Sequence, residues 1–367
     1  MHLTSTKERV FGLDLMRALA IILVLLGHCL WIYPSTNVFL TSIFQVFAFL
    51  GVEIFFVLSG FLIGSIVYRL YVDEEYSKKT VFYFLKRRWF RTLPTYYLVL
   101  LMNVLIAFFY TSLDGNVWRY FLFLQNFNGT MLPFFPESWS LSIEEFSYFL
   151  LPLALLLYKP KNRSLSFVVI ISVLISMSLM AKMLFHIATN NTDINLWNAA
   201  VKSVVVYRLD AIFIGVLCSW IAFNFQLFWK KFSKMFCLFG ILSMAFLFVG
   251  IGYFRILITT HPLFWNVFYL PLVSISIAFF LPILSQWKTF DSKLSKPITF
   301  ISMISYSIYL LHYSIILQLM KSWIVIDPQN LLKLHIFTAV YIAITVTLSY
   351  FVYRFFEKPM MDLRDKN

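Results

Sequence analysis

Charged residues are scarce in this chain of 367 residues, in which Asp, Glu, Lys and Arg together make up 13%. A soluble domain carries about twice that fraction, whereas here apolar runs long enough to cross a bilayer recur along the whole length. Acidic residues are the rarer kind, with 17 against 30 Lys and Arg, which gives a net charge of +13. The composition argues against an ordinary soluble domain and predicts an all-α integral membrane protein.

Cysteine is also rare. The three cysteines, Cys29, Cys218 and Cys237, all fall inside apolar runs. They form neither a disulfide framework nor a set with metal-ligand spacing, so we expect no metal site. The first apolar run has the look of a secretory signal that ends at Cys29, but His28 stands where cleavage needs a small residue. We therefore predict an uncleaved first span.

Ten apolar segments are long enough to be membrane-spanning helices. They lie at residues 12–33, 43–70, 92–111, 140–158, 164–185, 200–222, 235–254, 263–285, 299–320 and 334–356. We expect the longest connecting segment, residues 111–139, to lie on the membrane or to re-enter it. The sequence shows no boundary between domains, so we expect residues 1–367 to form a single transmembrane domain without an appended soluble domain.

The distribution of basic residues indicates the orientation. With the N-terminus in the cytoplasm, 22 of the 30 Lys and Arg fall in inside segments and 6 in outside segments, while Arg17 and Arg208 lie within spans. Lys and Arg favour the cytoplasmic side, so this split predicts that both termini are cytoplasmic. The positive charge is thus mostly explained by topology. The lipid bilayer is the expected surrounding, and nucleic acid is not an expected partner.

The first span carries polar side chains on one face. Arg17 and His28 are 11 residues apart, so in a helix their side chains point within about 20° of each other, ~16 Å apart along the axis. Asp14, one turn before Arg17, lies on nearly the same face. Alone, Arg17 would be read as reaching back to the inner interface and His28 as a core histidine. Their shared face favours a functional pair.

Four further spans are predicted to carry ionisable groups in the outer half of the membrane. These groups are Glu53, Glu144, Glu145, Arg208, Asp210 and His312. A charge at the centre of a spanning helix costs ~2.5–3.5 kcal/mol, so such groups usually pair or line a cavity. We expect them to converge with His28 in one cavity. The alternative is a set of separate interhelical pairs, in which Arg208 binds Asp210 or another carboxylate.

A basic cluster is predicted at the inner mouth of the third span. The segment YFLKRRWFRTLPTYY (83–97) contains Arg87, Arg88 and Arg91. Arg88 and Arg91 are about one helical turn apart and can share a ligand. We give equal weight to two interpretations of this cluster. The cluster either marks topology and contacts anionic lipid, or it binds a polyanionic ligand such as a phosphorylated cofactor.

Five segments, taken in order, resemble the acyltransferase 3 family of integral membrane acyltransferases. They are GLDLMRALAIILVLLGH (12–28), with the family's spacing of ten residues between arginine and histidine; GVEIFFVLSGFLIG (51–64); FLKRRWFRTLP (84–94), with its RxxR; SWSLSIEEFSYFLLP (138–152); and YRLDAIFIG (207–215) with ISYSIYLLH (304–312). Two departures occur: Glu53 stands where the family often has Asp, and EEFSY replaces the usual Glu-Glu-Gln-Phe-Tyr.

The resemblance implies an O-acyltransferase, usually an O-acetyltransferase. Such an enzyme moves an acyl group from cytoplasmic acyl-CoA to a hydroxyl of a carbohydrate, a lipid-linked glycan or another cell-envelope acceptor, often on the outer side. It implies a multi-pass protein of the bacterial cytoplasmic (inner) membrane. Acyl-CoA would be the donor substrate, and no permanently bound cofactor is expected.

Site roles follow from the resemblance together with the depths of the polar residues. Arg17, Arg87, Arg88 and Arg91 are expected to bind acyl-CoA. His28 is expected to act as a general base, or as a nucleophile that forms an acyl-imidazole, with Glu144 or Glu53 orienting its ring. Ser59, Glu145, Arg208, Asp210 and His312 are expected in supporting or acceptor-side roles, Arg208 as a stabiliser of the oxyanion.

A function of another class fits part of the pattern. Carboxylates and histidines inside a membrane also suit a proton relay, as in a proton-coupled transporter or a flippase of sugar or lipid. A proton relay needs no site for CoA. Binding of CoA therefore separates the two readings.

Overall fold

The computed structural model describes residues 9–33, 38–73, 76–110, 115–158, 161–325 and 327–363. Within these ranges the chain is helical and has no strand. Ten helical stretches in the described ranges are long and apolar enough to cross a membrane, which confirms the predicted number. They are Phe11–Trp31, Val38–Val72, Lys78–Phe109, Pro136–Leu157, Arg163–Thr189, Val205–Asn224, Ser233–Tyr253, Phe264–Gln286, Ser295–Trp323 and Leu331–Leu363.

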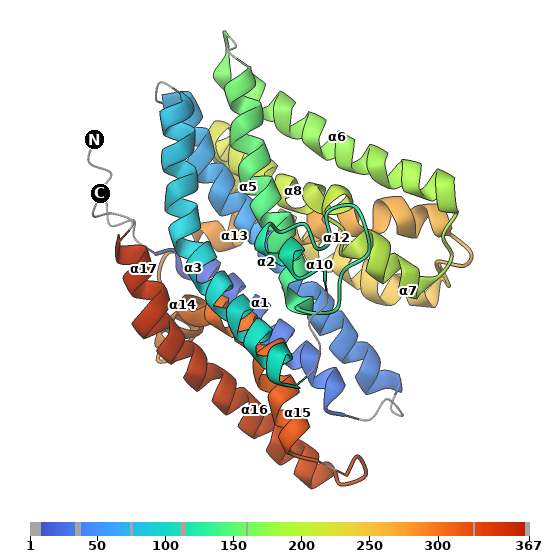
Figure 1. Ribbon diagram of the computed structural model, residues 1–367. Helices are drawn as coiled ribbons and strands as arrows, with labels where there is room; N and C mark the ends of the chain where they lie inside the picture. The colour runs from blue at the N-terminus through green and yellow to red at the C-terminus, as the bar shows by residue number, and fades with distance from the viewer. Residues whose placement is uncertain are drawn as a thin grey trace.

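The helices form one bundle around α2 (Figure 1). The long elements are α1 (Phe11–Gly27), α2 (Val38–Asp73), α3 (Lys78–Tyr110), α5 (Trp139–Leu157), α6 (Arg163–Thr189), α8 (Val205–Asn224), α10 (Ser233–Ala245), α12 (Tyr269–Ala278), α14 (Ser295–Leu311) and α16 (Leu331–Val352). Helix α2 packs against α1, α5, α6, α8 and α12. It is largely apolar around its circumference, as expected of a helix enclosed by other helices.

Short elements complete several spans. A 3₁₀ turn, η1 (His28–Trp31), extends α1, and π-helical segments η6 (His312–Leu317) and η7 (Tyr353–Glu357) follow α14 and α16. The remaining short elements are α4 (Trp118–Phe121), η2 (Pro136–Ser138), α7 (Ile194–Trp197), η3 (Asn198–Lys202), α9 (Gln226–Lys231), η4 (Phe246–Gly250), α11 (Ile251–Tyr253), η5 (Phe264–Phe268), α13 (Leu281–Gln286), α15 (Gln318–Trp323) and α17 (Lys358–Leu363).

The outer helices expose apolar side chains. Figure 1 shows α6 on one flank of the bundle and α16 with α17 on the opposite flank. Exposed residues include Val169 and Val173 on α6, Phe239 on α10, and Ile336 and Leu348 on α16. In a bilayer these side chains meet lipid tails rather than water, so their exposure carries no penalty.

Two glycines set the close contact of α2 with α8. A β-carbon at Gly60 would lie 2.0 Å from the carbonyl oxygen of Ile212, and one at Gly215 would lie 2.2 Å from that of Val57. No side chain fits at either position, and small residues are what allow helix backbones to approach this closely in a membrane.

We expect Gly60→Ala to destabilise the protein by at least about 1–3 kcal/mol, because the backbones must separate to admit the methyl group. Gly252→Ala is the matched control, since nothing lies within 4 Å of a β-carbon there. Thermal unfolding of both purified variants in detergent checks the prediction. Equal melting temperatures for the two variants would contradict it.

The third span begins earlier than predicted. The hydropathy pattern places its start at residue 92, whereas α3 begins at Lys78. Lys and Arg are good helix formers, so the basic residues end the apolar run without ending the helix. Arg88 is therefore about 15 Å along the helix axis from its first residue, rather than just outside the span.

The connection before α5 packs into the protein. Residues 115–138 of the predicted re-entrant segment are described, and Asn126 and Phe135 are fully buried there. Tyr96 donates a 2.8 Å hydrogen bond to the carbonyl of Tyr120, and the Asn126 amide donates to the carbonyl of Trp139 at 2.9 Å. The buried η2 leads directly into α5, so α5 starts inside the bundle.

Candidate active site

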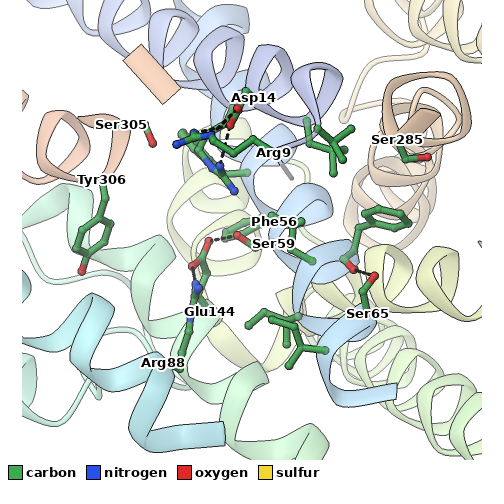
Figure 2. Close-up of a pocket in the computed structure, with 18 of the residues that line it drawn as sticks. Arg9, Asp14, Phe56, Ser59, Ser65, Arg88, Glu144, Ser285, Ser305 and Tyr306 are labelled. Atoms are coloured by element: carbon green, nitrogen blue, oxygen red, sulfur yellow. Dashed lines mark hydrogen bonds and ion pairs between the residues drawn. The ribbon is translucent and has the colours of Figure 1, made fainter. Parts of the chain in front are cut away.

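A cavity of about 760 Å³ opens among α1, α2, α3, α5 and α14, with α8, α9 and α13 completing its wall. This volume lies within the range of small-molecule sites, roughly 300–1,000 Å³. Figure 2 shows Arg9 with Asp14 on one wall and Arg88 with Glu144 on another. The polar lining residues include Arg9, Asp14, Arg17, Ser59, Arg69, Arg88, Arg91, Glu144, Lys230, Ser305, Tyr306 and Tyr309.

Basic side chains dominate this lining. Among the described residues, six cations line the cavity, namely Arg9, Arg17, Arg69, Arg88, Arg91 and Lys230, against two carboxylates, Asp14 and Glu144. A cavity with this excess has a positive potential and favours anionic ligands. Arginines present planar forks of N–H donors that match phosphate oxygens.

Asp14 organises the arginines of the first helix. Arg9 donates two hydrogen bonds to its carboxylate, at 2.8 and 2.7 Å, and these bonds raise the pKa of the Arg9 guanidinium. Ser302 on α14 donates to the same carboxylate at 2.8 Å. Arg17 lies 3.6 Å from Asp14 and donates to Ser302 at 3.4 Å. Asp14 and Arg17, two of the three residues of the predicted polar face of the first span, therefore lie together and line the cavity.

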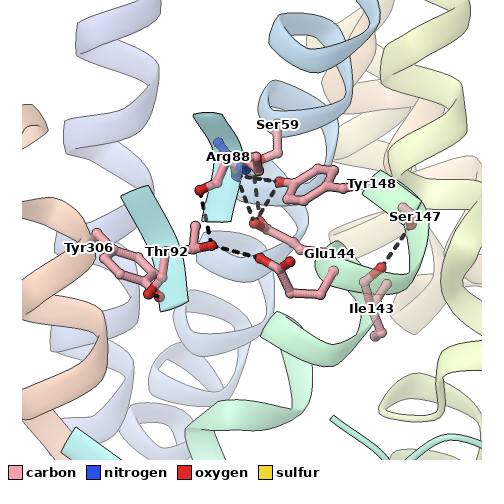
Figure 3. Close-up of polar contacts among 9 residues, drawn as sticks. Ser59, Arg88, Thr92, Ile143, Glu144, Ser147, Tyr148 and Tyr306 are labelled. Atoms are coloured by element: carbon pink, nitrogen blue, oxygen red, sulfur yellow. Dashed lines mark hydrogen bonds and ion pairs between the residues drawn. The ribbon is translucent and has the colours of Figure 1, made fainter. Parts of the chain in front are cut away.

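Glu144 organises the opposite wall (Figure 3). Its carboxylate accepts hydrogen bonds from Ser59 at 3.1 Å and from Tyr148 at 2.6 Å. Arg88 lies 3.4 Å from the same carboxylate and donates to the Tyr148 hydroxyl at 2.7 Å, with its guanidinium over the Tyr148 ring. Helices α2, α3 and α5 thus meet in one polar cluster on the cavity wall.

The predicted difference in depth between Arg88 and Glu144 is wrong. The sequence pattern placed Arg88 at the inner mouth and Glu144 near the outer surface, yet the two side chains form an ion pair. The reason is that α3 begins at Lys78, well before Arg88, and that α5 begins inside the bundle. Glu145 also faces α3, where it accepts a 2.9 Å hydrogen bond from Thr92.

His28 is not one of the residues that line this cavity. Val52 lines the cavity, and the neighbouring Gly51 packs against Ala20 and Val24. His28 is one helical turn beyond Val24. On α1 the lining ends at Arg17, about 16 Å of axial rise before His28, whereas Tyr309 of α14 lines the cavity and its ring centroid lies 5.8 Å from that of His312.

His28 and His312 are brought together, as expected. Nε2 of His312 lies 3.3 Å from Nδ1 of His28, and the two ring centroids are 4.6 Å apart. Nδ1 of His28 also lies 2.9 Å from the carbonyl oxygen of Val24. The ring of Tyr313 packs on His28 with a centroid separation of 4.9 Å.

Glu53, Arg208 and Asp210 do not join His28 in one cavity, so the predicted convergence is wrong for them. Glu53 and Arg208 are fully buried and bind each other, while Ser274 donates to Glu53 at 3.1 Å. Asp210 binds Lys182 at 2.5 Å. The alternative expectation, separate interhelical pairs with Arg208 on a carboxylate other than Asp210, is confirmed.

The expected orienting carboxylates also lie elsewhere. Among the described residues, Glu53 is held by Arg208 and Ser274, and Glu144 by Arg88, Ser59 and Tyr148. Nδ1 of His28 instead contacts the carbonyl oxygen of Val24 and Nε2 of His312. If Glu144 has a catalytic role, it therefore acts from the cavity wall and not through contact with the His28 ring.

Comparison with known proteins identifies the family. A family model described as an acyltransferase domain matches residues 10–354. The chain belongs to the acyltransferase 3 family. It is similar to O-acetyltransferase OatA of Staphylococcus aureus strains NCTC 8325 and COL, with 28% identity over 382 residues in each case. The match covers 95% of this chain and 57% of each relative, so the chain spans little more than half their length. No solved structure matches.

The acyltransferase 3 assignment confirms the resemblance drawn from the ordered motifs, while the roles of individual residues stay predictions. Three of the four expected acyl-CoA-binding arginines line the cavity: Arg17, Arg88 and Arg91. Arg87 is not among the lining residues. Its guanidinium donates to the Tyr83 hydroxyl at 2.8 Å and covers the Tyr83 ring.

Sequence reasoning missed several polar residues of this acyltransferase 3 domain. Tyr148 follows Glu144 by one turn, and that i,i+4 spacing was the available signal. Ser302 and Lys182 gave no signal, because a serine is common in any helix and Lys182 is one of the six basic residues that the topology places in outside segments. Glu137 gave no signal either, because its burial and its bonds to Ser314 depend on the packing of η2 against η6.

Proposed function

We propose that this protein is a membrane O-acetyltransferase that transfers an acetyl group from acetyl-CoA to a hydroxyl of a carbohydrate or another cell-envelope acceptor. The observation that carries the proposal is the arginine-lined cavity, whose wall includes Arg17 of α1 and Tyr309 of α14, the residue whose ring packs against His312. Membership of the acyltransferase 3 family and the O-acetyltransferase name of the relatives support the reaction class.

The cavity suits the donor. CoA is a polyanion whose long, flexible arm ends in the thioester. Arg9, Arg69 and Arg91 line the cavity, and the Arg9 side chain is 47% exposed. These arginines would hold the phosphates, and Arg17 would contact the donor farther in. The rise of ~16 Å from Arg17 to His28 is comparable to the reach of such an arm.

The orientation follows from the basic residues. The excess of Lys and Arg in inside segments favours an arginine-lined cavity that opens to the cytoplasm, where acetyl-CoA would enter. His28 then lies toward the outer side, near an acceptor that approaches from there. The arrangement would let the acetyl group cross without the whole CoA. A bacterial cytoplasmic membrane is the expected location.

The chemistry assigned to His28 is general base catalysis. The acceptor hydroxyl gives its proton to a neutral imidazole nitrogen of His28 while its oxygen attacks the thioester carbonyl carbon. The carbon–sulfur bond then breaks, and the CoA thiolate takes up the proton from His28. The alternative, in which His28 itself attacks the thioester and is acetylated, uses the same nitrogen lone pair.

We expect Arg88→Gln to raise the Kd for acetyl-CoA by about 10-fold or more, since a hydrogen bond to a charged group contributes about 1.5–3 kcal/mol. Arg87→Gln is the matched control: it changes the neighbouring arginine on the same helix, outside the cavity lining. Equilibrium binding to protein in nanodiscs checks this. Equal losses in both variants, or no binding to the well-folded wild type, would contradict the proposal.

A further inference from the structure

The hydrogen-bond partners of His28 and His312 determine where their protons lie. Nδ1 of His312 lies 2.7 Å from the carbonyl oxygen of Tyr309, and Nδ1 of His28 lies 2.9 Å from that of Val24. A carbonyl oxygen only accepts, so both Nδ1 atoms carry hydrogens. In a neutral imidazole the other nitrogen then holds a lone pair. For His312 that lone pair is on Nε2, the atom 3.3 Å from Nδ1 of His28.

We propose that His312 is a positioning residue for the acetyl transfer, and this inference rests on the proposed function. The Nδ1–H group of His28 is shared between the Val24 carbonyl and Nε2 of His312. That arrangement fixes the tautomer in which Nε2 of His28 is free to accept a proton. When the acceptor hydroxyl gives its proton to Nε2, the Nδ1–H of the resulting imidazolium binds the His312 lone pair more strongly.

Burial and neighbouring hydrogen bonds hold His312 in place. His312 is fully buried and is the first residue of the π-helical segment η6, a kind of insertion that is frequent at functional sites. The Tyr309 hydroxyl lies 2.6 Å from the Ser140 hydroxyl and donates to the carbonyl of Glu137 at 2.9 Å. These bonds fix the turn whose carbonyl receives Nδ1–H of His312.

In this proposal a neutral imidazole takes the place that a carboxylate has in a Ser-His-Asp triad. In a Ser-His-Asp triad a carboxylate holds the histidine tautomer and stabilises the imidazolium. Here a second imidazole accepts the Nδ1 hydrogen, and no proton needs to move to His312. The proton balance of the reaction is unchanged, since the proton passes from the acceptor hydroxyl to Nε2 of His28 and then to the CoA thiolate.

The test compares two substitutions of nearly equal length in nanodisc-reconstituted protein. His312→Gln keeps an acceptor oxygen near the place of Nε2, whereas His312→Met lacks one. We expect His312→Met to lower kcat for CoA release from acetyl-CoA by about 100-fold with KM for acetyl-CoA unchanged, and His312→Gln to restore most of the loss. His312→Phe is a second acceptor-free variant should the methionine variant aggregate.

The outcomes separate this inference from the proposed function. Equal activity of the Gln, Met and Phe variants would overturn the role of His312 as an acceptor while leaving the acetyltransferase intact. A rise in KM without a fall in kcat would likewise overturn it, because it would indicate an effect on donor binding alone. A wild type that neither binds acetyl-CoA nor releases CoA would overturn both.

Discussion

His28→Ala is expected to reduce CoA release from acetyl-CoA by about 10²–10⁴-fold, the range associated with a positioned general base. The reason is that the variant has no nitrogen to accept the proton of the attacking hydroxyl. The cavity and its arginines are unchanged, so the Kd for acetyl-CoA should stay close to that of the wild type. Thiol release measured in nanodiscs, beside equilibrium binding, checks both parts.

The control for this prediction is His261→Ala. His261 is exposed and contacts Thr260 in the connection before η5. The same substitution there should leave turnover unchanged. Full activity of His28→Ala would remove His28 from the chemistry. Radiolabelled acetyl groups that stay on the wild type after a quench, but not on His28→Ala, would favour the acetyl-imidazole route over general base catalysis.

Single substitutions in the Glu53–Arg208 pair are expected to prevent stable folding. Both side chains are fully buried, and they connect α2 to α8. Glu53→Met would leave the guanidinium without its partner, and Arg208→Met would leave a buried carboxylate. Removing one member of a buried ion pair costs about 3–5 kcal/mol, a large part of the total stability of a protein. Yield of monodisperse protein and its melting temperature measure the effect.

The double variant Glu53→Met/Arg208→Met is expected to recover most of this loss, because apolar side chains of similar volume often replace a buried ion pair without cost. Ser274 keeps a partner in the carbonyl of Leu270, at 3.2 Å. If the folded double variant also turns over acetyl-CoA, Glu53 is structural rather than catalytic. Single variants as stable as the wild type, or a double variant as unstable as the singles, would contradict this reading.

The spans could be predicted because the membrane imposes a simple rule. Backbone groups in a bilayer must be satisfied within helices, so each long apolar run becomes one. The rule fails where a charged segment continues a helix, as at Lys78–Arg91 in α3. It also fails for residues 115–138, whose hydrogen bonds to other parts of the bundle make the segment an internal element.

The polar face of the first span could be predicted because helical spacing alone places Arg17 near Asp14. The partners of the other ionisable groups could not, because they depend on which helices meet. Glu53 binds Arg208 and not His28 because α2 and α8 pack closely at Gly60 and Gly215. His312 reaches His28 because α14 packs against α1, a contact between residues 284 positions apart.

The most direct test of the account is whether the arginine-lined cavity recognises the phosphates of CoA. Labelled acetyl-CoA would be bound to wild-type protein in nanodiscs and then challenged with unlabelled CoA or with acetyl-pantetheine, which lacks the nucleotide phosphates. The account predicts saturable binding that CoA displaces and acetyl-pantetheine displaces only weakly. Absence of saturable binding, or equal displacement by both compounds, would contradict it.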